Sequence, residues 1–218
     1  MNVLEDAEGR NDLARLGVRS VPVLARGERY IFAQSRRAIV EFLGLDDTAR
    51  QLPPEILTDR ILRFLDVATA ILPLMPAARL DTYVPGRPRS YRDLAFHLFT
   101  VVDAFLAATE GRTLVQAMFA EKPPASADMT AIVEHGAEVR RRFLAWRDAG
   151  GLTRTRPLPT YYGPQPLGDL LERTAWHCGQ HVRQWGLLLE REGAALPAPP
   201  LSEAEMADLP FPANVCDG

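Results

Sequence analysis

The stretch that decides the fold is Glu172-Arg173-Thr174-Ala175-Trp176-His177-Cys178-Gly179-Gln180-His181-Val182-Arg183-Gln184-Trp185. It lies in a run without proline from Leu167 to Leu196, which predicts one long helix. A four-three repeat, typical of a helix packed in a bundle, comprises Leu167, Leu171, Thr174, Cys178, His181, Trp185 and Leu188. Residues four apart share a helix face, so His177 and His181 can reach one metal ion. Two such histidines also occur as ordinary surface or core residues.

A third histidine makes a metal site the better interpretation. The segment from Ser90 to Ala108 predicts a second amphipathic helix, with Ser90 and Asp93 forming a capping box. His97 falls on its apolar stripe, and burying an imidazole without a partner costs free energy. Three histidines on core-directed faces therefore suggest one shared metal with an open position for catalysis. The ligand type suits zinc first, with nickel, iron, copper, manganese or cobalt as alternatives.

One histidine on the second helix and a His-x-x-x-His within Glu172–Trp185 resemble the DinB/YfiT-like superfamily of metal-binding four-helix bundles. The resemblance covers residues 52–192. It implies a mainly α fold, and a divalent metal held by His97, His177 and His181. Characterised members include S-transferases and isomerases that use small cellular thiols, and hydrolases, while many others have no known activity. The resemblance thus indicates the fold and the metal more strongly than any reaction.

Composition narrows the classes of protein. The 218 residues carry a net charge of −3, and the scattered basic residues give no electrostatic case for nucleic acid. No apolar run approaches the length of a membrane span, and acidic residues follow Met1, so we expect a cytoplasmic protein. Cys178 and Cys216 do not make a disulfide framework. Lys122 is the only lysine, and the arginine-rich composition is typical of a GC-rich bacterial genome.

Residues 1–48 differ from the rest. The pattern predicts a strand at 2–5, a helix at 8–16, a hairpin at 19–33 around Gly27 and a helix at 35–43. This order, with the stretch Leu16–Leu24, resembles the second half of a glutaredoxin or thioredoxin fold. The resemblance implies a cis bond before Pro22 and a backbone edge at Val21 that binds a thiol.

This segment departs from that family in one important respect. The opening strand and helix that carry the family's redox cysteines are missing, which excludes dithiol redox chemistry by residues 1–48. A segment this short cannot bury a core of its own, so we expect it to pack on the bundle or to pair across a homodimer. Alternatively, the true start of the gene lies upstream, and the upstream reading frame would then encode a Cys-x-x-Cys segment.

Four helices are expected in residues 52–192. The first begins after Pro53-Pro54 with a stripe from Leu57 to Met75, and the third runs from about 126 to 149. The connection between the second and third is long enough to cross the bundle. His135, off the stripe of the third helix, is expected to face solvent. The proline-rich tail, residues 193–218, is expected to strap across the bundle or to be partly disordered.

Several residues are candidates for the surroundings of the metal. Arg173 lies one turn before His177, where it could bind an acidic thiol such as glutathione or pair with a neighbouring carboxylate. Tyr161 and Tyr162, in a loop at one end of the bundle, could wall a pocket or plug the core. Cys178 is expected to be a core residue rather than a fourth ligand.

The leading functional hypothesis is a metal-dependent enzyme that acts on a small-thiol conjugate by S-transfer or isomerisation. It rests on the two family resemblances, and no side chain stands out as a general base. A metal-dependent hydrolase with the same three ligands is the first alternative. A metal- or thiol-binding module without catalysis is the second. The partner expected in each case is a small molecule, with no nucleic acid and no membrane.

Overall fold

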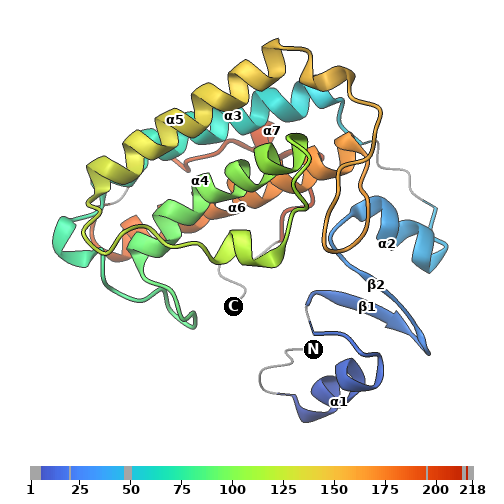
Figure 1. Ribbon diagram of the computed structural model, residues 1–218. Helices are drawn as coiled ribbons and strands as arrows, with labels where there is room; N and C mark the ends of the chain where they lie inside the picture. Colours follow the sequence, from blue (N-terminus) through green and yellow to red (C-terminus); the bar gives the residue numbers. More distant parts are fainter. Residues whose placement is uncertain (1–5, 20, 47–50, 195, 213–214, 216–218) are drawn as a thin grey trace. The chain divides into compact units, whose positions relative to one another are not determined.

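The chain divides into two units, residues 1–48 and 49–218, each held together mainly by its own contacts. The computed structural model describes residues 6–19, 21–46, 51–194, 196–212 and 215 (Figure 1). Within these residues, none of the helices combines the length and the apolar character that a membrane span requires.

The N-terminal unit is a helix, a hairpin and a helix: α1 (Ala7–Arg15), β1 (Val23–Arg26), β2 (Arg29–Phe32) and α2 (Arg36–Leu43). The two strands are antiparallel, and Gly27 takes a φ of +63° in the turn between them. Ser35 caps the start of α2 and Gly44, with a φ of +66°, ends it. These elements confirm the expected order; the strand predicted at 2–5 lies outside the described residues. The Val21–Pro22 bond is cis, as predicted, while the likeness to a glutaredoxin half stays a prediction.

The second unit is a bundle of four helices: α3 (Pro54–Ile71), α4 (Tyr91–Thr109), α5 (Met129–Asp148) and α6 (Leu167–Arg191). Helix α6 packs on α3 and α4, and α5 packs on the same two helices (Figure 1). Helices α4 and α5 are direct neighbours that run in the same direction, and the long connection between them returns along the bundle, as the predicted crossover requires (Figure 1). Residues 72–90 and 149–166 join helices that lie diagonally opposite. The long connection after α4 contains the turn η3 (Gln116–Ala120), which packs back on α4.

Local sequence explains where the helices begin and end. Helix α3 stops at Ile71, earlier than its apolar stripe, because Pro73 has no N–H and disfavours helix at the residue before it. A short turn, η1 (Leu72–Leu74), follows, and Met75 still reaches the core with 3% of its surface exposed. At the start of α4 the predicted capping box of Ser90 and Asp93 is present. The helices thus keep the register that the sequence predicts.

The core runs the length of the bundle, and its largest fully buried side chains are Trp185, Phe64, Phe99, Phe105 and Phe143. The indole N–H of Trp185 donates to the carbonyl of Ile71 at 3.3 Å, which satisfies both groups at the end of α3. Helices α4 and α5 pack tightly at a glycine on α5. A Cβ at Gly136 would lie 2.2 Å from Cζ of Phe99 on α4, so no larger residue fits there without movement.

The described part of the tail packs on the bundle, which was one of the two arrangements expected for it. Past the end of α6 the chain forms the short helix α7 (Glu203–Met206), and Leu201 and Leu209 are buried in the bundle core. The Phe211 ring lies against α6 at Gly179, where an added Cβ would be 2.6 Å from the ring. Burial of these apolar side chains holds the described part of the tail in place.

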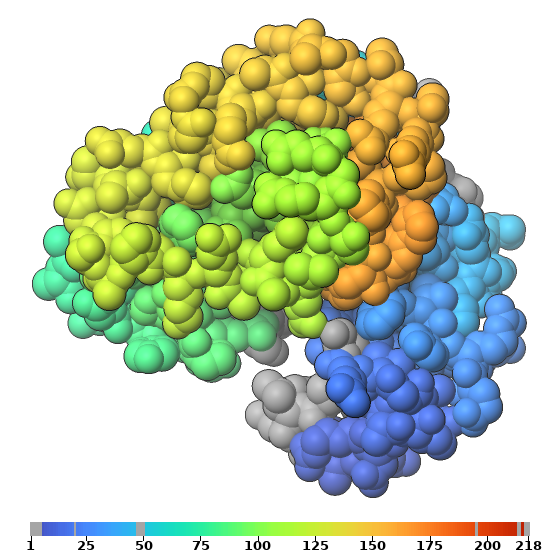
Figure 2. Space-filling model, in the orientation of Figure 1, coloured from blue at the N-terminus to red at the C-terminus, as the bar shows by residue number. Residues whose placement is uncertain are grey.

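Two connections, residues 110–128 and 149–166, meet on the surface of the bundle, where the yellow-green and orange segments adjoin (Figure 2). The Leu114 N–H donates to the Pro159 carbonyl at 2.9 Å, and the Tyr161 N–H donates to the Leu114 carbonyl at 2.8 Å. These bonds join the segment before η3 to the loop before α6. The two joined segments carry Phe119, Tyr161 and Tyr162, which form part of the candidate site.

Candidate metal centre

Three histidines meet between α4 and α6. One nitrogen from each of His97, His177 and His181 lies within 4.8 Å of the others. The ring centroids are 4.8 Å apart for His97 and His181, 4.9 Å for His177 and His181, and 5.3 Å for His97 and His177. Because His177 and His181 stand one turn apart on α6, the shared face predicted from their spacing meets His97 on α4. Among the described residues, no cysteine or carboxylate joins this group.

The ring nitrogens have the environment that metal ligands need. Nδ1 of His177 and Nε2 of His181 are buried, and no described residue forms a hydrogen bond with either atom. The second nitrogen of His181, Nδ1, lies 3.1 Å from Oε1 of Gln184, and the His97 ring donates to the carbonyl of Phe119. Such outer contacts orient metal-binding histidines and fix their tautomers. The buried nitrogens without partners would otherwise cost free energy, which a bound cation would offset.

The protonation state also fits a cation. Burial lowers the pKa of His97 to about 4, and burial lowers the pKa of His177 and of His181 well below the ordinary value. The three imidazoles are therefore neutral at pH 7, the form that binds a metal. Three neutral nitrogens and no carboxylate suit a divalent ion such as zinc. As whole residues, His177 and His181 are partly exposed, although Nδ1 of His177 and Nε2 of His181 are buried.

The predicted substrate-side residues surround one side of the cluster. Arg173 stands one turn before His177 on α6 and is almost fully buried. Its Cζ lies 4.8 Å from the ring centre of Phe119 and 5.8 Å from that of Tyr162, and its guanidinium donates to the Tyr161 hydroxyl. Burial raises the pKa of Tyr162 to about 12, so its hydroxyl is neutral at pH 7. The arginine is thus held as a cation in an aromatic setting beside the histidines.

The other predicted thiol-binding residues, Val21 and Pro22, belong to the N-terminal unit. The structure describes that unit by itself, so their role stays a prediction.

Cys178 is confirmed as a core residue. It is fully buried, and burial raises the pKa of its thiol far above the ordinary value. Its Sγ lies 3.8 Å from the carbonyl oxygen of Leu98. A buried neutral thiol that packs as a small apolar side chain is neither a nucleophile nor a metal ligand.

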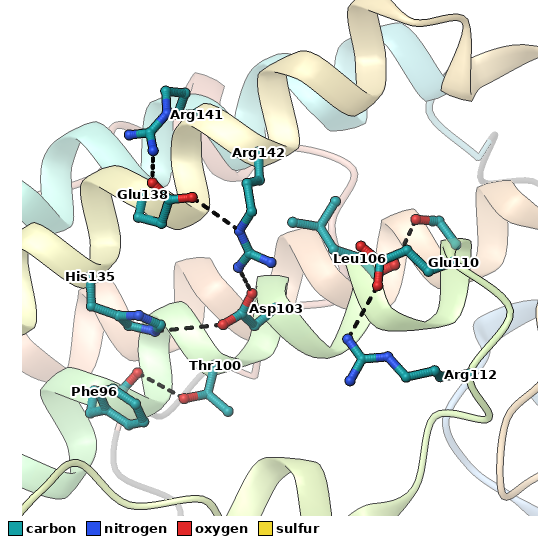
Figure 3. Close-up of polar contacts among 11 residues, drawn as sticks. Phe96, Thr100, Asp103, Leu106, Glu110, Arg112, His135, Glu138, Arg141 and Arg142 are labelled. Carbon is teal, nitrogen blue, oxygen red and sulfur yellow. Dashed lines mark hydrogen bonds and ion pairs between the residues drawn. The ribbon is translucent and has the colours of Figure 1, made fainter.

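The expectation that His135 faces solvent is wrong. Its ring stacks on Phe96 with centroids 4.7 Å apart, and Nε2 lies 3.6 Å from a carboxylate oxygen of Asp103 on α4 (Figure 3). Arg142 pairs with the same carboxylate. The reason is the adjacent Gly136, which brings α5 so close to α4 that neighbouring side chains become half-buried. His135 is therefore part of a separate polar contact between two helices.

Three residues that shape the site, Gln184, Phe119 and Arg89, were not predicted from the sequence. Gln184 follows His181 by three residues, a spacing at which helix side chains meet, so the sequence held a signal for it. Phe119 contributes a carbonyl and a ring from an irregular connection, which no periodic pattern marks. Arg89 precedes the cap of α4, and its charge lowers the pKa of all three histidines. No spacing rule points to a residue in that position.

The fold and the site together define a helical bundle with a candidate three-histidine metal centre between two of its helices. The family model of the DinB superfamily matches residues 32–185. The chain belongs to the DinB superfamily, a metal-binding family. No curated protein and no solved structure matches the chain.

Proposed function

We propose that this protein is a metal-dependent enzyme that acts on a small-thiol conjugate of the glutathione type, by S-transfer or isomerisation. One observation supports the proposal most directly. Three neutral histidines converge beside Arg173, whose guanidinium packs against an aromatic ring, and two of their buried ring nitrogens have no hydrogen-bond partner among the described residues. His97, His177 and His181 would hold the cation. A bound divalent metal lowers the pKa of a coordinated thiol or water and so supplies a nucleophile near neutral pH.

A thiol substrate is favoured over a water-activating hydrolase by the surroundings of the histidines. An ordinary thiol ionises about seven pH units more readily than water, so it needs less help from a general base. No carboxylate of the described residues joins the histidine group, so no base is positioned within it. A metal-bound water can itself ionise near pH 7, so the hydrolase is the alternative that the assay below must separate from the thiol enzyme.

The chain's own residues have distinct roles in this proposal. Arg173 binds and orients a carboxylate of the substrate, and the rings of Phe119 and Tyr162 shield that contact from water. Gln184 and the Phe119 carbonyl hold the His181 and His97 rings in place. Because the histidines are neutral, the charge of a bound cation is not compensated by the protein. The site consequently favours anionic ligands.

The experiment is a turnover assay of zinc-loaded protein with glutathione and electrophilic or isomerisable acceptors, with and without added thiol. The proposal expects thiol-dependent turnover that is lost in His181→Ala and retained in the matched control His135→Ala. Arg173→Gln should raise KM for carboxylate-bearing thiols roughly 10- to 100-fold with a smaller effect on kcat, because a charge-assisted contact is lost. Turnover of esters or amides that ignores added thiol would show a hydrolase instead. Tight thiol binding without turnover over the panel would show a binding module.

A further inference from the structure

Residues 115–122, in the connection after α4, form a surface segment that is held mainly at its two ends (Figure 2). At one end, Leu114 is 1% exposed and forms two backbone hydrogen bonds with the loop before α6. At the other end, Pro123 is buried. Between these two anchors no residue is buried, and only Met118 and Phe119 are half-buried. A segment with so few buried contacts can move away from the bundle at a lower cost in free energy than a core helix.

The half-buried Phe119 lies against three residues of the histidine site. Its ring centre is 5.8 Å from that of His177, 6.4 Å from that of His97 and 4.8 Å from Cζ of Arg173. Because Nδ1 of His177 and Nε2 of His181 are buried, a neighbouring group must move before solvent or a ligand can reach them. Helices α4 and α6 are packed in the core, whereas Phe119 belongs to a segment with no buried residue. Phe119 is therefore the neighbour that moves most easily.

An ion pair ties this segment to the helix that carries His97. Nζ of Lys122, three residues after Phe119, lies 3.0 Å from Oδ2 of Asp93. Asp93 is held in the capping box of the first turn of α4, so the pair joins the segment to a fixed point. The Lys122 side chain is 66% exposed, and an exposed ion pair contributes little to stability. The tie thus holds the segment in position and opens readily.

We propose that residues 115–122 form a gate over the histidine site, with Phe119 as the gating side chain and the Lys122–Asp93 ion pair as its latch. In the closed state seen in the structure, the Phe119 ring covers two of the histidines. In the open state the segment swings about its two anchors, and the ring nitrogens become accessible. The gate controls how fast a metal ion enters and leaves, not how tightly it is bound. This inference goes beyond the proposed function, because it concerns access to the histidines whichever reaction they support.

Transfer of bound zinc to an excess of a chromogenic chelator, followed by stopped flow, measures how fast the site opens. Phe119→Ala removes the ring and keeps the carbonyl that orients His97. It should speed both zinc release and zinc uptake by at least about tenfold, because the half-buried ring no longer covers the site. Lys122→Gln should speed both by about two- to fivefold, the effect of one exposed ion pair. The affinity for zinc should stay close to that of the wild type, because uptake and release change together.

Lys122→Arg is the matched control, because arginine can keep the ion pair with Asp93, and it should exchange zinc at the wild-type rate. A second measurement uses the metal-free protein and the acylation of histidine by diethyl pyrocarbonate, located by mass spectrometry. His97 is only 6% exposed and lies under the Phe119 ring, so it should react slowly in the wild type and faster in Phe119→Ala. His135 lies outside the gate and should react equally in both proteins.

The inference is overturned if Phe119→Ala exchanges zinc and reacts with the reagent at the wild-type rates. It is also overturned if release alone accelerates and the affinity for zinc falls in proportion, because Phe119 would then position the ligands rather than control access. Equal rates in Lys122→Arg and Lys122→Gln, both faster than the wild type, would contradict the latch. Faster acylation of His97 in Phe119→Ala, in a protein that binds no zinc, would support the gate and contradict the metal centre.

Discussion

Acid should destabilise the metal-free protein through the buried histidines, and His97 allows the size of this effect to be worked out. In an unfolded chain an imidazole titrates near pH 6.5, whereas burial lowers the pKa of folded His97 to about 4. Below pH 6.5 the unfolded state therefore binds more protons than the folded state. The contribution of neutral His97 to the free energy of unfolding is therefore fully present above about pH 6.5, and it is lost as the pH falls towards 4.

Between pH 7 and pH 5 this single ring should lower the free energy of unfolding by about 2 kcal/mol. The pKa values of His177 and His181 are also lowered by burial, so both rings add to the loss in the same direction. The free energy of unfolding of an ordinary domain is only about 5–15 kcal/mol, so this loss is a large fraction of it. A metal bound to the three rings would oppose it, because the cation and the protons compete for the same nitrogens.

The assay is urea unfolding followed by far-UV circular dichroism, in the presence of a chelator, at pH 7 and pH 5. His97→Leu fills the position with an apolar side chain that does not titrate. Its difference in unfolding free energy between the two pH values should be smaller than that of the wild type by about 2 kcal/mol, with equal m-values. Parallel pH dependence of the two proteins would refute the reasoning, because the His97 ring would then titrate as if it were exposed.

Three further outcomes are expected. Gly179→Ala should release the tail, because its Cβ would lie 2.6 Å from the Phe211 ring. We expect the free energy of unfolding in urea to fall by about 1–3 kcal/mol, and proteolysis after α6 to become faster. Unchanged cleavage would contradict the packing of the tail on α6. Gly136→Ala should cost a similar amount in thermal unfolding, since its Cβ would lie 2.2 Å from an aromatic ring of α4; an unchanged Tm would show that the helices are further apart. In a Cys216→Ser background, the buried neutral thiol of Cys178 should react with a thiol reagent only after denaturant is added, and labelling of the native protein would contradict its burial.

The sequence predicted the helices and the histidine cluster because both depend on regular spacing. The His177 and His181 pair, the stripe around His97 and the cap at Ser90 all follow from helix periodicity, which tertiary packing did not alter. Which helices pack on α4 was not predicted, because the length of a connection does not determine which helix it leads to.

The prediction that His135 faces solvent was wrong for a different reason. The close approach of α5 to α4 depends on the absence of a side chain at Gly136, an effect that a hydrophobic stripe does not show. Phe119 and Arg89 reach the site from irregular segments, whose paths are set by tertiary contacts rather than by periodicity. The residues that would decide substrate specificity are therefore the ones that the sequence marks least.

His97, His177 and His181 are expected to hold one divalent ion, and metal content and affinity are the most direct measurements of it. Elemental analysis and chelator competition would compare the wild type with His97→Ala, His177→Ala and His181→Ala, with His135→Ala as the matched control. Because loss of an outer contact typically costs 10- to 100-fold in metal affinity, loss of a ligand should cost more than about 100-fold. We expect one ion per wild-type chain, a loss of that order in each of the three variants and none in the control. Full metal content in His97→Ala, or a loss in His135→Ala, would contradict it.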